Sequence, residues 1–470
     1  MIGPGFEQLE ERKLLASHAG LLLEEFPEDV SDHFAADFVA DPSEVMSLKS
    51  VAANGVESAV AIQSSHLVTR QHTLRGDLDF DGDVDVLDLT TMIVNFTSVG
   101  GVGKIRAEGD IDWDGDVDSF DLTVAISNFT GALPNTSPFA FFGMVTVSPD
   151  VILNGQGHII DSLAFWEAPD AADSLLFVTA KNNQMVEIWK FPFEDHELTP
   201  LTHTSFGTNT NVNGVAVDQL SDRLYVTISA PVSTVSVFSL PEFQLVDQLI
   251  QGNVILKSTP NIGLLHHENG QDWVYVTADN LVHVHDAATG AKIGNFTPDK
   301  GLETIVADDY YQRVYSPDER GKTGIYAYRP DGSRYLRDGS NWLSESGVFQ
   351  ADAEGIVLYK CYASAGDSKS HYDNGNGLIV VADQRSLATD FELFDRRTWA
   401  YLGTLRIEGV SNTDGIASTQ QPLPGYPLGL FAAVHDDTST VVVGWETILT
   451  AAGLNCDPAP SLRHQPTANI

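Results

Sequence analysis

Basic residues are scarce in this 470-residue chain. Lysine and arginine together number 26 against 65 aspartates and glutamates, which gives a formal net charge of -39 and a sequence pI near 4.4. Such a chain repels nucleic acid and anionic membrane surfaces, and it repels phosphorylated molecules unless cations bind first. The acidic excess therefore argues against a nucleic-acid-binding protein and favours one that works with multivalent cations.

Cysteines and long hydrophobic runs are also scarce. Cys361 and Cys456 are too few for a disulfide framework but leave room for one bridge. No apolar run approaches the roughly 20 residues that a membrane-spanning helix needs, so we expect no membrane span. The N-terminus lacks a clean signal peptide, because the apolar run from Ala16 to Leu23 is short and interrupted by polar residues.

Residues 1–72 are polar and acidic with little periodicity, and we interpret them as a leader or disordered segment. The stretch from Phe6 to Ala16 contains the sequence Leu-Glu-Glu-Arg-Lys-Leu-Leu. It resembles a leader motif found near the start of many large exported or surface proteins of some bacteria. A short amphipathic helix is the alternative. We expect a secreted or cell-surface protein.

Two aspartate-rich segments repeat in register, from Gly76 to Leu89 and from Gly109 to Leu122, and each continues into an apolar stretch that ends Asn-Phe-Thr. Calcium takes six or more oxygen ligands, and carboxylates at loop positions 1, 3, 5, 9 and 12, with glycine at position 6, supply them. The repeat favours calcium loops over acidic loops without metal. The candidate ligands are Asp77, Asp79, Asp81, Asp83 and Asp88 in the first copy, and Asp110, Asp112, Asp114, Asp116 and Asp121 in the second.

Aspartate at position 12, with a single helix after each loop, resembles the dockerin module. The resemblance covers about residues 73–131 and implies a small α-helical domain that docks onto a cohesin-like protein in an assembly or tethering role. Dockerins usually have asparagine at some loop positions where this chain has aspartate throughout. Residues 132–141, which include Pro134 and Asn135, predict a linker.

From residue 142 to 455, short apolar runs alternate with turns rich in glycine, aspartate and asparagine, which is typical of antiparallel strands. Examples are Ser174–Thr179, Arg223–Ile228, Trp273–Thr277 and Gly377–Ala382. The runs come in pairs that recur at roughly 45 to 50 residues, the period of a propeller blade, so about 310 residues predict six blades. We expect a mainly β protein with a six-bladed β-propeller, a small N-terminal α-helical dockerin-like domain and a disordered tail at residues 456–470.

Several motifs in the second half of this region resemble the β-propeller phytases. They are Leu302–Tyr310, Asp352–Gly355, Thr413–Ile416, Tyr426–Phe431 and Trp445–Glu446, in the family's order. Family members hydrolyse phytate with calcium ions in a central acidic channel that hold the phosphates and activate water. The resemblance implies metal-binding and catalytic roles for Glu303, Asp352, Glu354 and Asp414, further ligands at Asp161 and at Asp318 or Glu319, and a phosphate contact from Lys181.

Several basic positions of that family are absent. No arginine is evident from Thr227 to Val235, and Ala278-Asp279 replaces an expected lysine. Basic groups contribute strongly to phosphate binding. We therefore predict a calcium-dependent phosphomonoester hydrolase of the phytase type, acting on phytate or a related compound. The alternative is a non-catalytic phytase-like propeller that serves as a binding domain in a dockerin-assembled extracellular complex.

Other candidates have ordinary explanations. His283 and His285 alternate on a strand, as zinc ligands do, but no third ligand is evident, so a polar strand face is the favoured interpretation. Lys181 is also consistent with a solvated lysine at a strand end. A single acidic residue at such a place can simply cap a turn.

Overall fold

The computed structural model describes most of the chain beyond residue 73. The described ranges are 74–79, 82–97, 100–101, 103–131, 137–155, 159–181, 184–193, 202–205, 211–230, 233–250, 260–278, 281–298, 304–318, 324–335, 348–364 and 371–456. The leader-like stretch and the tail from residue 457 lie outside these ranges.

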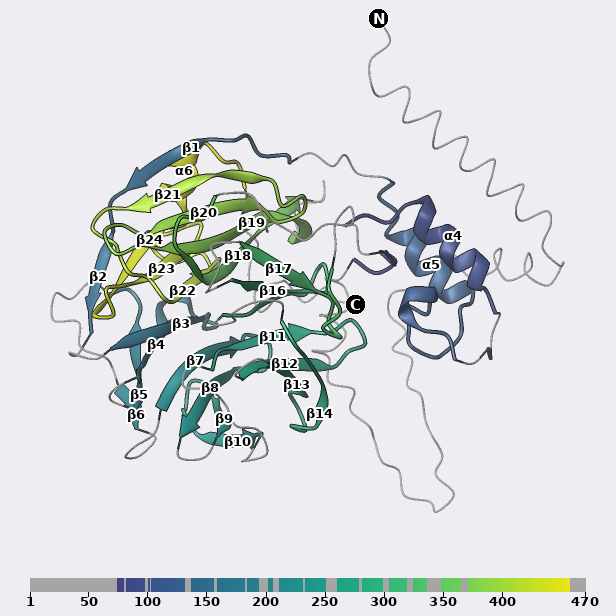
Figure 1. The fold of residues 1–470 in the computed structure, drawn as a ribbon, viewed down its shortest axis with the longest axis horizontal. Helices are drawn as coiled ribbons and strands as arrows, with labels where there is room; N and C mark the ends of the chain where they lie inside the picture. The colour runs from purple at the N-terminus through teal and green to yellow at the C-terminus, as the bar shows by residue number, and fades with distance from the viewer. Residues whose placement is uncertain are drawn as a thin grey trace, which may run out of the picture. The chain divides into compact units, whose positions relative to one another are not determined.

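The described residues form six β-sheets that follow one another around a common centre in chain order (Figure 1). The first three sheets consist of β3 (Ile160–Trp166), β4 (Leu175–Ala180), β5 (Met185–Lys190) and β6 (Thr202–Ser205); β7 (Asn211–Asp218), β8 (Arg223–Ala230), β9 (Thr234–Ser239) and β10 (Leu245–Leu249); and β11 (Ile262–His266), β12 (Asp272–Ala278), β13 (Leu281–Asp286) and β14 (Lys292–Phe296).

The last three sheets are built in the same way, with successive antiparallel strands. They consist of β15 (Val306–Asp308), β16 (Arg313–Pro317) and β17 (Ile325–Tyr328); β18 (Asp352–Ser364), β19 (His371–Gln384), β20 (Asp390–Asp395) and β21 (Tyr401–Ile407); and β22 (Ile416–Thr419), β23 (Leu430–His435) and β24 (Ser439–Gly444). The fold is therefore a six-bladed β-propeller, as predicted.

Two early strands complete the last two blades. β1 (Gly143–Val147) pairs in parallel with β21, and β2 (Val151–Asn154) pairs antiparallel with β24. The segment before the first blade is thus hydrogen-bonded to blades formed some 250 or more residues later, since Gly143 is opposite Gly403 and Val151 is opposite Val442. This pairing joins the two ends of the propeller and closes the ring.

Burial on both faces explains why the central strands have continuous apolar sequences. Leu378–Ala382 in β19 is fully buried, because neighbouring blades cover both faces of each sheet. After β24 the chain forms α6 (Trp445–Ala452), which packs in the same core as β18. A disulfide between Cys361 of β18 and Cys456 ties the end of this segment to the fifth blade.

The aspartate-rich repeats form a small helical unit, which we call the aspartate-loop unit (residues 74–131). It contains α4 (Val86–Asn95), the 3-10 turn η1 (Arg106–Glu108) and α5 (Ser119–Ser127). Each α-helix is preceded by an aspartate whose side chain caps its first turn, Asp85 for α4 and Asp118 for α5. The carboxylate of the aspartate three positions later accepts a hydrogen bond from the backbone N–H of the capping residue. Among the described residues, no helix is long and apolar enough to span a membrane.

Candidate functional site

The innermost strands of the blades place polar residues at equivalent positions. The paired register of β3 skips Asp161–Ser162, that of β7 skips Asn213–Gly214, and that of β18 skips Glu354–Gly355. In the sixth blade Asp414–Gly415 immediately precedes β22. β-Bulges of this kind turn side chains out of the regular ladder. The same structural position is therefore acidic in the first, fifth and sixth blades and an amide in the second.

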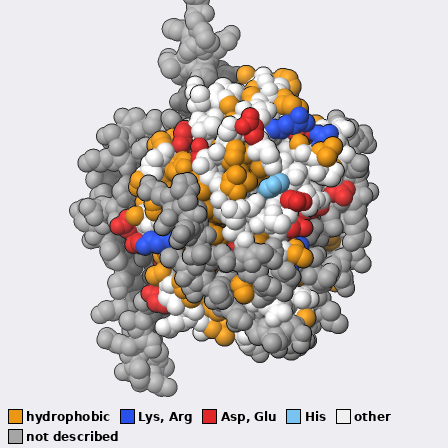
Figure 2. All heavy atoms as spheres, turned by 90° about the vertical axis from the view of Figure 1, so that its left-hand side faces the viewer, with side chains coloured by type: hydrophobic (Ala, Val, Ile, Leu, Met, Phe, Trp, Pro, Cys, Tyr) orange, Lys and Arg blue, Asp and Glu red, His pale blue; other side chains and the backbone are white. Residues whose placement is uncertain are grey.

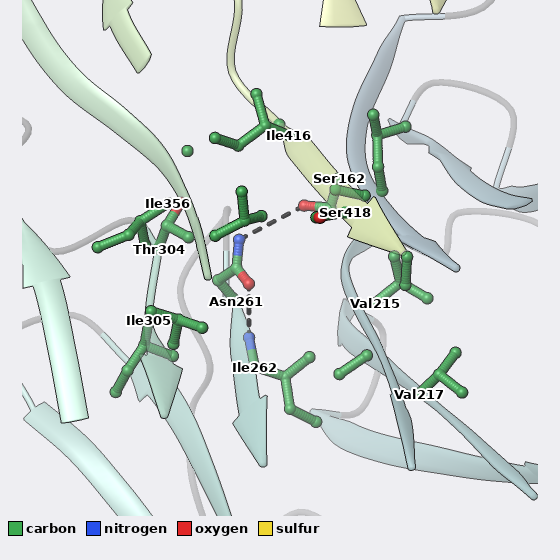
Figure 3. Close-up of a pocket in the computed structure, with 18 of the residues that line it drawn as sticks. Ser162, Val215, Val217, Asn261, Ile262, Thr304, Ile305, Ile356, Ile416 and Ser418 are labelled. Carbon is green, nitrogen blue, oxygen red and sulfur yellow. Dashed lines mark hydrogen bonds between the residues drawn. The ribbon is translucent and has the colours of Figure 1, made fainter. Parts of the chain in front are cut away.

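A cavity of about 230 Å³ lies between the six innermost strands. Its lining is mixed: the acidic residues Asp161 and Asp414 and several other polar residues share it with apolar side chains such as Val215, Ile262, Ile305, Ile356 and Ile416 (Figure 3). The Asn261 side-chain amide donates a hydrogen bond of 3.4 Å to the Ser162 hydroxyl across this space. The cavity thus combines a charged end with a lining of both polar and apolar side chains.

Lys181 joins two of the predicted acidic residues. Its Nζ lies 2.7 Å from Asp161 Oδ1 and 3.7 Å from Asp414 Oδ2, and its side chain is 24% exposed. The Gln384 amide donates a hydrogen bond to Asp414 Oδ1. Asp437 also feels the charges of this group: burial raises the pKa of its carboxyl, while nearby Lys181 lowers it and nearby Asp161 raises it. Residues from the first, fifth and sixth blades meet here.

Two glycines allow this close approach between neighbouring blades. A Cβ on Gly415 would lie 2.1 Å from the main-chain oxygen of Asp161, and a Cβ on Gly355 would lie 2.7 Å from that of Asp414. Any other residue at either position would push the strands apart. The glycines in the Asp-Gly and Glu-Gly motifs therefore set the distances between the acidic residues.

The other predicted propeller ligands have less direct connections. Glu354 is buried at the bulge of β18, and half-buried Asp352 is opposite Gln384 in the β18–β19 register. Asp318 is fully buried just after β16, where its backbone N–H donates to the Gly324 carbonyl. Glu303 and Glu319 lie outside the described residues. The part that these five side chains play in metal binding stays a prediction.

Sequence reasoning missed Asp437 and Gln384. Asp437 follows Asp436 in the turn between β23 and β24, where an Asp-Asp pair has an ordinary explanation as a turn former. Its proximity to Lys181 depends on closure of the ring between the sixth and first blades. The backbone N–H of Ile160 donates to the Asp437 carbonyl at 3.0 Å, which fixes that turn beside β3.

The aspartate loops bring their carboxylates together. Ligand atoms lie within 4.8 Å of one another in four groups: Asp77, Asp79 and Asp88; Asp83, Asp85 and Asp88; Asp110, Asp112 and Asp121; and Asp116, Asp118 and Asp121. Asp85 and Asp118, the helix-capping residues, were not named as candidate ligands, although they occupy loop position 9 of the spacing that predicted the calcium loops. Asp114 accepts a hydrogen bond from the Asp116 backbone, and Asp81 lies outside the described residues.

The donor set of these loops fits a hard cation. In each loop the position-6 glycine N–H donates to the position-1 aspartate at 3.0 Å, from Gly82 to Asp77 and from Gly115 to Asp110. The second oxygen of Asp110 is buried without a hydrogen-bond donor among the described residues. Burial, with the charge of nearby Asp121, raises the pKa of Asp112 to about 6. Clustered carboxylates of this kind are costly to ionise together unless a cation binds.

A further group of titratable side chains lies outside the cavity. Asp383, Asp390 and Glu392 form a buried acidic group, and Arg385 and Arg406 both pair with Asp390.

Surface charge alone does not mark a site on the face that Figure 2 shows. There, described acidic and basic side chains are interspersed with apolar and uncharged ones.

His283 and His285 lie with their ring centroids 6.4 Å apart. Both are buried, and burial lowers the pKa of each. No third His, Cys, Asp or Glu completes a metal-binding group with them among the described residues. Both histidines lie on β13 of the third blade, where they are buried and do not form a solvent-facing polar surface.

Fold and geometry together define a six-bladed β-propeller with an acidic, lysine-containing end to its central cavity. Residues 264–445, from β11 to the first residue of α6, match the Phytase family model. The 3-phytase of Bacillus subtilis (strain 168) is 27% identical over 179 residues, which cover 35% of this chain and 44% of that relative. The matched region thus spans less than half of the relative's length. The propeller is phytase-like.

Proposed function

We propose that this protein is a calcium-dependent phosphomonoester hydrolase of the β-propeller phytase type that acts on phytate or a related phosphorylated compound. The carrying observation is the contact of Lys181 with Asp161 and Asp414, which gathers a phosphate-binding cation and two candidate calcium ligands at one end of the cavity. The family match over residues 264–445 supports the reaction class.

Each side chain has a distinct part in this proposal. Asp161, Glu354, Asp414 and Asp437 would hold calcium, and calcium bound there would supply the positive charge that neutralises phosphate oxygens. The Lys181 ammonium group would donate hydrogen bonds to a phosphate oxygen. The burial of Asp161 and Glu354 would strengthen these electrostatic contacts.

The register also supports the non-catalytic alternative. The skipped pairs of β3 and β7 are equivalent, since the Ser162 N–H donates to Thr179 Oγ1 at 2.9 Å and the Gly214 N–H donates to Thr227 Oγ1 at 2.7 Å. By this register Ser229, an uncharged residue, occupies in the second blade the position of Lys181 in the first. A binding propeller needs fewer basic groups than an efficient phosphatase.

Phosphate release from calcium phytate by the full chain, with and without a chelator, separates the two functions. If the protein is a hydrolase, phosphate release should depend on calcium. Lys181→Gln is then expected to lower kcat/KM about 10- to 100-fold, which corresponds to the loss of one charge-assisted hydrogen bond to the phosphate. Lys292→Gln, at an exposed lysine of β14, is the matched control and should leave the rate unchanged. No calcium-dependent release from the wild type would leave the binding function in place.

We further propose that the aspartate-loop unit acts as a dockerin-type module that binds calcium in its loops and tethers the propeller to a cohesin-like protein. Exposed apolar side chains on its helices, including Leu87, Val94 and Phe120, support a protein partner. Calcium-dependent binding of purified cohesin modules to the full chain tests this, and absence of binding to any of them argues against tethering.

The disulfide supports a secreted or cell-surface location, since such bonds persist in oxidising compartments. Cell fractionation followed by detection of the protein tests the location, and recovery in the cytosolic fraction alone would contradict it.

A further inference from the structure

The aspartate-loop unit and the propeller share buried contacts. Residues Ile62–Pro466 form one compact unit by their contacts. Arg106, in η1 between the two loops, is 7% exposed, and its Nε donates to Oε1 of Glu268, which is 3% exposed in the β11–β12 turn. Its Nη2 donates to the main-chain oxygen of Asp77, the first residue of the first loop, at 3.0 Å. Arg106 therefore links loop one directly to the third blade.

The second loop reaches the same turn through an aromatic side chain. Trp113 lies between candidate ligands Asp112 and Asp114, and its ring meets the His267 ring edge-on with centroids 5.4 Å apart. His267 in turn stacks on Trp273 of β12 at 4.0 Å. The conformation of the second loop thus determines where Trp113 packs on the propeller.

A third set of contacts involves the β15–β16 turn of the fourth blade. The Leu74 backbone N–H donates to the Tyr310 carbonyl at 2.8 Å. Tyr311 is buried in the same apolar cluster as Met92 of α4 and Ala125 of α5. The core of the aspartate-loop unit is therefore completed by a propeller residue.

We propose that the aspartate-loop unit is a fixed part of the propeller, docked on the β11–β12 and β15–β16 turns, and that calcium in its loops stabilises these two turns. Calcium would order the loop that carries the Asp77 carbonyl and the loop that carries Trp113, and both contact the propeller. By thermodynamic linkage, the factor by which calcium favours the docking contacts is also the factor by which those contacts raise the calcium affinity of the loops. This inference rests on calcium binding by the loops, one part of the proposed function, and is independent of catalysis.

The docking contacts lie away from the candidate site. Asn261, which lines the cavity, precedes β11, and the strand then runs to His266 beside the docked turn. Calcium in the loops and calcium at the cavity would therefore protect different peptides from exchange.

Hydrogen–deuterium exchange of the full chain, measured with calcium and with chelator, tests the coupling. In the wild type, calcium is expected to slow exchange at least about tenfold in the loops, in residues 266–273 and in residues 309–313. Glu268→Gln removes the charge that pairs with Arg106 and leaves every loop carboxylate in place. It should keep calcium protection in the loops and at residues 309–313 but lose part of it at residues 266–273.

The matched control is Glu242→Gln, at an exposed glutamate between β9 and β10, and it should behave as the wild type. The double change Asp112→Asn and Asp121→Asn disables the second loop alone. It should remove the part of the calcium protection at residues 266–273 that depends on Trp113, while peptides covering residues 413–418 keep their calcium response. Wild-type protection confined to the loops, or a Glu268→Gln protein that matches the wild type at residues 266–273, would overturn the coupling. Loss of phosphatase activity in any variant would not bear on it.

Discussion

Substituting Arg396 by methionine is expected to destabilise the propeller severely. Arg396 is fully buried, and its Nε and Nη2 donate to the Asp308 carboxylate at 2.6 and 2.5 Å. Its Nη1 and Nη2 also donate to the Asp373 carboxylate at 2.7 and 2.9 Å. Because Asp308 ends β15 and Asp373 lies in β19, this one guanidinium joins the fourth and fifth blades.

The magnitude follows from the charges left behind. Methionine matches much of the arginine volume but leaves two buried carboxylates without their cation, and breaking a buried ion pair in this way costs about 3–5 kcal/mol. Burial opposes ionisation of Asp308, yet the Arg396 ion pair outweighs it and holds the Asp308 pKa below its usual range. The wild type therefore gains stability from this pair above the unfolded-state pKa and loses it as the pH falls through the lowered pKa.

In the Arg396→Met protein, the pH dependence of the stability that Asp308 contributes has the opposite sign. With its cation gone, burial raises the Asp308 pKa, so acidification neutralises the uncompensated charge and relieves the penalty. The free-energy difference between variant and wild type, measured by urea unfolding with circular dichroism, should shrink from pH 7 toward pH 4. Arg334→Met, at an exposed arginine, is the control. A loss under about 1 kcal/mol at pH 7, well below the range for a broken buried pair, would refute this reasoning, and so would a loss that does not change with pH.

Three further predictions concern the same framework. Replacing Cys361 by alanine removes its disulfide with Cys456, which lies 95 residues further along the chain. Chain entropy predicts that the free energy of unfolding, measured by thermal unfolding, falls by up to about 4–5 kcal/mol. Gly415→Ala would place a Cβ 2.1 Å from the Asp161 oxygen, so it should cost about 1–3 kcal/mol of stability and weaken calcium binding measured by calorimetry. Burial raises the pKa of Glu392 to about 7, so wild-type stability should fall as the pH rises from about 4.5 through 7, and Glu392→Gln should remove this dependence in urea unfolding.

Each of these predictions has an outcome that contradicts it. Wild-type protein with reductant should melt like the cysteine variant, and an unchanged melting temperature in both would argue against the bridge. Gly294→Ala, with open space around the added Cβ, is the control for Gly415→Ala, and equal effects of the two would exclude a local clash. For Glu392, an identical pH profile in variant and wild type would mean that the carboxyl is ionised throughout.

The propeller itself could be predicted from the sequence because its strands carry their own signal. Apolar runs such as Arg223–Ile228 and Gly377–Ala382 are strands in the structure, and their recurrence at a blade-length period predicted six blades. The roles of β1 and β2 could not be predicted, since their partners β21 and β24 lie hundreds of residues away and short strands do not specify a partner.

The candidate site was predictable only where a motif marked it. Asp161, Lys181 and Asp414 each belong to segments that resemble family motifs, and the structure brings them into contact. Asp437 belongs to no such motif. Arg396 lies in a turn, and its acidic partners Asp373 and Asp308 are 23 and 88 residues away in the sequence. Long-range electrostatic contacts of this kind depend on ring closure, which no local pattern encodes.

The central claim is that acidic residues from separate blades hold a cation at the cavity. Calorimetric titration of the full chain with calcium, compared with the Asp161→Asn/Asp414→Asn double variant, tests it most directly. The account predicts that the wild type binds more calcium per chain than the variant, while binding to the aspartate loops is the same in both. Equal numbers of bound calcium ions in the two proteins would contradict it.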